Sequence, residues 1–186
     1  MYKEKGSKFL AYAFPVRSEE QVGELLQEVR KKHPKSRHCC FAWQIGTNSV
    51  SHRYSDDGEP NNSAGKPIYG QLQSFELTDA LVVVIRYFGG VKLGVGGLVN
   101  AYRSAAKLCL EKAEIVTKYM TSDYAIRFDY ADMDRVMRVI KEMDMHILSQ
   151  EMNLDCRMQV SVRSGRQVEA DRALGELRFA EVRKLS

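Results

Sequence analysis

The apolar positions of this chain repeat every second residue in some stretches and every three or four residues in others, so the pattern alone predicts strands and helices. In the first half, the expected strands are residues 8–16, 40–45, 49–54 and 81–85. A capping box of Ser18 and Gln21 opens a helix that Pro34 ends. A helix or an extended segment is expected near residues 66–73, and a long helix follows the last strand.

The pattern restarts near residue 118. The expected order there is strand, helix, two strands, helix and strand, which is the βαββαβ order of the ferredoxin-like plan. These elements are residues 121–128, 133–143, 146–152, 156–162, 167–177 and 181–185. The patterns therefore predict an α+β protein of two domains, residues 1–115 and 118–186.

A glycine-rich loop separates the buried strand at residues 81–85 from the long helix. Glycine permits positive φ and lets backbone N–H groups approach a ligand, so such a loop before a helix predicts an anion site, with Arg86 and Lys92 beside it. The alternative is a tight, crowded crossover between strand and helix. Five of the 13 glycines lie in this loop: Gly89, Gly90, Gly94, Gly96 and Gly97.

The loop matches neither of the common phosphate motifs. Gly89 and Gly94 have the spacing of a P-loop, but Val95 and Gly96 stand where lysine and then serine or threonine are needed. A dinucleotide fingerprint that starts at Gly94 and Gly96 needs a third glycine at the position of Val99. Neither ATP nor NAD is indicated, and no cofactor is expected.

A second unusual segment, residues 55–67, consists mostly of turn formers and carries Asp56, Asp57 and Glu59. Clustered carboxylates could bind Mg²⁺ or take part in acid–base chemistry. They could also form a solvated turn, or pair with nearby lysine or arginine side chains to hold a site together. Metal sites normally take ligands from more than one element, so no metal is expected here.

Histidine and cysteine occur side by side at residues 38–40. His38 and Cys40 share one face of the expected strand, whereas Cys39 lies on the other face. A buried strand cysteine is commoner than a catalytic one, and no two cysteines have the CxxC spacing of a zinc site. No catalytic residue is therefore assigned.

Three motifs occur in a defined order: RH-x-C-x-A at residues 37–42, SDDGEP followed by AGKP at residues 55–67, and RYFGG-x-x-LG-x-GGL-x-x-AY at residues 86–102. Together they resemble the YigZ/IMPACT family of translation regulators over about residues 7–112. The resemblance implies an N-terminal domain like the second domain of ribosomal protein 5, and a C-terminal domain similar to the last domain of elongation factor G. Residues 61–63 depart from the family pattern, because relatives carry glycine and threonine before AGKP.

Composition agrees with a cytoplasmic protein. The chain of 186 residues has no apolar stretch of membrane-spanning length and no signal peptide, and its four cysteines lack the spacing of a disulfide framework. The net charge of +4 lies in residues 1–117, where 16 Lys and Arg face 12 Asp and Glu, while residues 118–186 carry 12 of each. This modest excess is compatible with a nucleic-acid patch and with a solvated helix end near residues 30–37.

Two classes of function remain. The first is a non-catalytic, translation-associated module that binds RNA or a ribosome-associated protein and no membrane. The second is a small enzyme that acts on a phosphorylated or nucleotide substrate; we favour the first, because no nucleophile–base pair can be assigned. The expected site joins the acidic turn to a second set of residues: Arg37, His38, Lys66, Arg86, Tyr87, Gly89, Gly90, Lys92, Gly94, Gly96 and Gly97.

Overall fold

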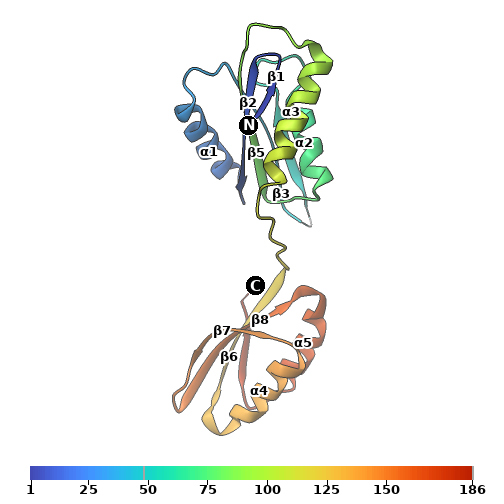
Figure 1. Ribbon diagram of the computed structural model, residues 1–186. Coiled ribbons are helices and arrows are strands. Elements are labelled where there is room, and N and C mark those ends of the chain that lie inside the picture. The colour runs from blue at the N-terminus through green and yellow to red at the C-terminus, as the bar shows by residue number, and fades with distance from the viewer. Residues whose placement is uncertain (48, 186) are drawn as a thin grey trace. The chain divides into compact units, whose positions relative to one another are not determined.

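The computed structural model describes residues 1–47 and 49–185. The chain divides into two compact units, Met1–Ile115 and Val116–Ser186. Each unit combines helices with one antiparallel sheet, so the protein has a mixed α and β structure (Figure 1). Within the described residues, no helix has both the length and the apolar character needed to cross a membrane.

The sheet of the first unit has its most apolar strand at the centre. Its strands are β1 (Tyr2–Glu4), β2 (Ser7–Pro15), β3 (His38–Ile45), β4 (Ser51–Ser55) and β5 (Ala80–Tyr87), in the order β1-β2-β5-β3-β4. All neighbouring strands are antiparallel. Strand β5 is central because its valine, leucine and isoleucine side chains are buried on both faces of the sheet.

Three helices cover the two faces of this sheet (Figure 1). They are α1 (Glu19–Lys32), α2 (Gly65–Ser74) and α3 (Gly94–Leu110). Leu81, Val83 and Ile85 pack with the apolar residues of α1, whereas Val82 and Val84 pack with those of α2 and α3. Because side chains alternate along a strand, the next residue on the α2 and α3 side of β5 is an arginine, at position 86.

The second unit has a four-stranded antiparallel sheet with helices on one face (Figure 1). The strands are β6 (Thr121–Asp129), β7 (His146–Glu151), β8 (Asp155–Arg163) and β9 (Glu181–Lys184), in the order β7-β8-β6-β9. The helices are α4 (Met133–Glu142) and α5 (Gln167–Gly175), each preceded by a short 3-10 turn. Buried and exposed residues alternate along β6, so one face of the sheet holds the core and the other face is open.

The structure adds one strand to those expected from the sequence. Strand β1 has three residues, too few to show a period, and it pairs with β2 through a turn in which Lys5 and Gly6 both have positive φ. The segment expected near residues 66–73 as either helical or extended is helix α2. Its helical form determines the site described below, because the acidic turn leads directly into it.

Each unit has its own hydrophobic core, so we expect a fragment of residues 1–117 to fold alone. Trp43, the only tryptophan of the chain, is buried in the first unit and reports its unfolding. Urea titration of the fragment, followed by tryptophan fluorescence and by circular dichroism, should give one cooperative transition with coincident midpoints. A fragment without such a transition would contradict this expectation.

Candidate functional site

Asp56 caps helix α2 from outside the helix. One side-chain oxygen, Oδ1, accepts hydrogen bonds from the N–H groups of Ala64 and Gly65 at 2.9 and 2.8 Å. The other, Oδ2, accepts from the N–H of Asn62 at 2.8 Å. The residue at the N-cap position is Ala64, which has no side chain to do this, so Asp56 satisfies the free amides of the first turn. Asn62 has φ 60°, a left-handed conformation that asparagine adopts more readily than most residues.

Asp57 joins the acidic turn to helix α1 and strand β3. Its Oδ1 pairs with Nη2 of Arg30 at 2.8 Å, and its Oδ2 accepts from the N–H of Cys39 at 2.7 Å. Its backbone carbonyl lies 2.9 Å from Nδ1 of His38. The pair with Arg30 is partly solvated, so it contributes at most about 1 kcal/mol to folding. Its effect is to fix the position of the turn.

Glu59 forms a buried ion pair with Arg86. Oε1 of Glu59 lies 2.7 Å from Nη1 of Arg86, and the two side chains are only 4% and 7% exposed. The hydroxyl of Tyr102, on α3, donates to the same carboxylate oxygen at 2.8 Å. The guanidinium also lies over the rings of Phe9 and Phe88, and its Nε has no hydrogen-bond partner within the described part of the chain. Burying two charges is costly, so this pair depends on its additional hydrogen bond and on close geometry.

Cys40 completes the buried network. Its thiol donates to the carbonyl oxygen of Asp56 at 3.0 Å, and its sulfur also lies 3.3 Å from the hydroxyl oxygen of Tyr102. Burial raises the pKa of Cys40, and it raises the pKa of Cys39 to about 11. High thiol pKa values disfavour the thiolate nucleophile, and the ring of His38 bonds to a backbone carbonyl. The geometry supplies no activated cysteine–histidine pair among these residues.

The three carboxylates of the acidic turn therefore have three different partners. One caps a helix, one binds an arginine of α1 and an amide of β3, and one is buried against Arg86. Among the described residues, no group of three or more His, Cys, Asp or Glu side chains is arranged to hold a metal ion. The turn connects elements of the fold and does not present its carboxylates as a set.

The glycines of the loop meet different demands. A Cβ on Gly89 would lie 1.9 Å from the backbone of Gly6, so packing requires glycine there. Gly90 and Gly94 have positive φ, which favours glycine for conformational reasons. Gly96 has neither constraint, because a Cβ at this position would meet no atom within 4 Å. Steric constraints therefore do not explain why position 96, in the first turn of α3, is a glycine.

The outer side of the loop is basic and open. Lys92 is exposed, and the close contact between Gly6 and Gly89 brings the backbone of Lys5 next to the loop. Leu93 stands at the N-cap of α3 without a side-chain hydrogen bond, and no acidic residue lies in the first turn. The first turn of α3 thus begins with exposed residues and has no carboxylate from the helix itself, a favourable arrangement for an anion.

The remaining residues expected at the site lie in different places. Arg37 is exposed just before β3, and Lys66 is exposed in the first turn of α2. Tyr87 lies on the opposite face of the sheet from Arg86, where its hydroxyl is 2.9 Å from Nδ1 of His33. The structure therefore brings the acidic turn to Arg86 and His38, and it separates Tyr87 from them.

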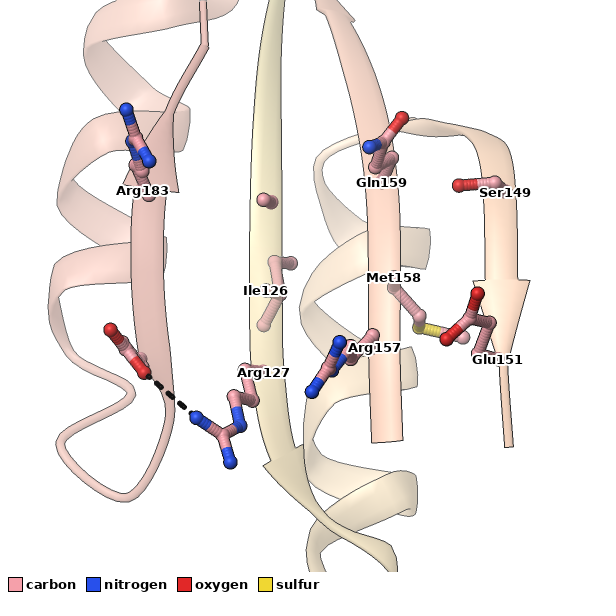
Figure 2. Close-up of a pocket in the computed structure, with 10 residues that line it drawn as sticks. Ile126, Arg127, Ser149, Glu151, Arg157, Met158, Gln159 and Arg183 are labelled. Carbon is pink, nitrogen blue, oxygen red and sulfur yellow. Dashed lines mark ion pairs between the residues drawn. The ribbon is translucent and has the colours of Figure 1, made fainter. Parts of the chain in front are cut away.

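Two hollows are lined mostly by residues that were not expected at a site from the sequence; Lys66, in the first of them, is the exception. A groove of about 600 Å³ crosses α2 in the first unit, and we call it the α2 groove. A hollow of about 440 Å³ lies on the open face of the second sheet (Figure 2). There Arg127 pairs with Asp155 at 2.7 Å and with Glu181 at 3.8 Å, so the charges of the second hollow are largely balanced locally. The α2 groove lacks this balance and is described further below.

The chain matches known proteins over its first unit and beyond it. Residues 5–110 match the Impact N-terminal domain family. An IMPACT family member from Haemophilus influenzae is 34% identical over 78% of this chain and 72% of its own length. YigZ from Escherichia coli is 29% identical over 92% of this chain and 85% of its own length. The crystal structure of a hypothetical protein aligns over 100% of this chain and 92% of its own, with 26% identity and a TM-score of 0.67.

A eukaryotic relative matches a smaller part of the chain. The protein IMPACT homolog of Saccharomyces cerevisiae is 32% identical over 49% of this chain and 36% of its own length. The fold defines a protein of two units. The first unit combines α and β structure and contains both the acidic turn, whose carboxylates bond within the protein, and the glycine loop. The chain belongs to the IMPACT family.

Removing one partner of the buried ion pair should destabilise the first unit strongly. We expect Glu59→Ala to lower the free energy of unfolding by about 3–5 kcal/mol, because it leaves Arg86 buried without its counter-charge. Urea unfolding of the full chain, followed by Trp43 fluorescence, measures this. Arg30→Ala breaks the partly solvated pair with Asp57 and serves as the matched control, with an expected loss of about 1 kcal/mol or less. Equal losses in the two variants would show that burial of the pair does not matter.

Proposed function

We propose that this protein is a non-catalytic, translation-associated regulator that binds nucleic acid or a ribosome-linked partner. The first unit makes the contact, through the glycine loop and the basic surface around it. The observation that carries the proposal is the start of α3, which has exposed residues and no capping side chain, with the exposed Lys92 and Lys5 close by. Family membership, and the translation regulation that the family resemblance implies, support the partner class.

The proposed site includes every residue set out from the sequence, in two roles. The glycine loop and the exposed cations contact the partner. The acidic turn, with the buried Arg86, holds the surface in shape. Tyr87 has the most indirect role, through the strand that leads into the loop. The contact set is Arg37, His38, Lys66, Gly89, Gly90, Lys92, Gly94, Gly96 and Gly97.

Binding is favoured over catalysis by the state of the carboxylates. A general base or metal ligand needs a side-chain oxygen directed at the substrate, whereas the oxygens of Asp56, Asp57 and Glu59 bond to amides, arginines and a tyrosine of the protein itself. An enzyme acting on a phosphorylated or nucleotide substrate would have to break these contacts first. The proposal therefore includes neither a cofactor nor a catalytic metal.

Both units support a link to translation through their architecture. We infer that the first unit has the fold of the second domain of ribosomal protein 5. For the second unit, the element order βαββαβ and the strand order β7-β8-β6-β9 support a ferredoxin-like fold, similar to the last domain of elongation factor G. Function does not follow from fold alone, so these similarities only narrow the class of partner.

The proposed location is the cytoplasm.

If backbone amides bind the anion, bulk at Gly96 should reduce binding more than removal of a nearby charge. We expect Gly96→Val to abolish binding of a fluorescein-labelled 12-nucleotide oligouridylate, and Lys92→Ala to weaken it by about 1 kcal/mol, the scale of a solvated contact. Fluorescence anisotropy measures both affinities, and circular dichroism confirms folding. Gly23→Val is the matched control, because Gly23 lies in α1 with equally open space around it. Equal affinity of folded Gly96→Val and the wild type would remove the support for an anion site.

The binding should reside in the first unit and depend strongly on salt. Contacts with phosphates release counterions, so the logarithm of the association constant should fall linearly with the logarithm of salt concentration. The fragment of residues 1–117 should keep the affinity and the salt slope of the full chain for the same oligonucleotide. Binding that is insensitive to salt, or that is found only in a fragment of residues 118–185, would contradict the proposed location.

A further inference from the structure

The α2 groove combines aromatic and cationic side chains. It is lined in part by His52 and Tyr54 of β4, by Lys66, Tyr69 and Gly70 of α2, and by Arg103 of α3. None of the described residues that line it carries a carboxylate. A hollow with cations and no acidic side chain attracts an anionic ligand, and its aromatic rings suit a planar one.

The rings form a nearly parallel cluster. Tyr69 stacks on His52, with ring centroids 4.5 Å apart and an angle of 12° between the planes, and on Tyr54 at 6.0 Å and 26°. The hydroxyl of Tyr69 donates to Gln44 at 3.1 Å, which fixes this central ring against the sheet. Tyr54 is a large aromatic side chain on the edge strand β4, and it is 37% exposed. The cluster therefore offers aromatic surface to a ligand on a rigid support.

Gly70 lines the groove and leaves open space at its own position. It lies inside helix α2, where glycine is less favourable than alanine, yet a Cβ at this position would meet no atom within 4 Å. Neither packing nor a positive φ requires glycine here. A remaining reason for glycine at position 70 is that it lets a ligand approach the helix backbone closely.

Two residues that line the groove, Val99 and Arg103, lie on the same helix as the end of the glycine loop. On α3, Val99 comes three residues after Gly96 and Arg103 comes seven residues after it, so the three residues share one face of the helix. With a rise of about 1.5 Å per residue, Gly96 and Arg103 are about 10 Å apart along the helix axis. A flexible chain of phosphates can span this distance.

We propose that the α2 groove binds single-stranded nucleic acid, with a base stacked on the ring cluster and phosphates at Lys66 and Arg103. This inference rests on the proposed function and names its ligand: a strand that passes from the groove to the amides at the start of α3. A single strand is favoured over a duplex, because only unpaired bases expose a ring face for stacking on protein side chains.

The test measures anisotropy of fluorescein-labelled oligouridylate of 12 nucleotides, and of a 12-base-pair RNA duplex, with the full-length protein. Tyr54→Ala should weaken single-strand binding at least 5-fold, the lower end of the effect of losing one stacking contact. Gly70→Leu fills the groove and should weaken it at least 10-fold without lowering the thermal midpoint followed by Trp43 fluorescence. Arg103→Gln should weaken binding and reduce the salt slope by about one.

The controls match each variant. Arg53→Gln removes a cation from the same strand as Tyr54 but on the opposite face of the sheet, where Arg53 pairs in register with Trp43. Gly23→Leu adds the same side chain to an open position of α1. Both should bind as the wild type does.

The outcomes separate the groove from the proposed function. Wild-type affinity of Tyr54→Ala and Gly70→Leu, together with lost binding in Gly96→Val, overturns the groove and leaves the proposed function intact. Duplex binding as tight as single-strand binding overturns stacking. If the wild type binds neither probe, the groove inference and the nucleic-acid form of the proposed function both fail.

Discussion

The buried ion pair of Glu59 and Arg86 is the contact on which the first unit depends. An arginine on the central strand of the sheet, facing two helices, is costly unless an opposite charge reaches it. The acidic turn supplies that charge, and Tyr102 of α3 adds a hydrogen bond. Because the carboxylate must arrive at this place, the path of the chain from β4 into α2 is constrained by electrostatics as much as by packing.

This constraint sorts the charges of the unit into two groups. The carboxylates of the turn bond within the protein, to the start of α2, to the amide of Cys39 in β3 and to Arg86 of β5. Positive charge remains outside, on Lys92 and on the cations of the α2 groove.

The sequence predicted the framework well and the site less well. The apolar run of β5 and the cap of α1 were recognisable, and Ser18 does accept from the N–H of Gln21, at 3.3 Å. Strand β1 was missed because three residues show no period. For the site, motif spacing drew attention to the right segments, but it could not tell which carboxylate would be buried. That depends on the direction in which Arg86 faces and on Tyr102, whose hydroxyl reaches the buried carboxylate only in the folded chain. The α2 groove was not recognised, since its rings come from β4 and α2 and meet only in the folded chain.

The acidic turn also determines how the unit opens. Amides of Asn62, Ala64 and Gly65 lie in or next to an irregular segment, yet their N–H groups bond to the same Asp56 carboxylate. Local fluctuations release such amides to solvent only when that carboxylate moves. The backbone carbonyl of Asp56 is itself held by the buried thiol of Cys40. In hydrogen exchange the three amides are therefore expected to lose protection together, because one carboxylate holds all of them.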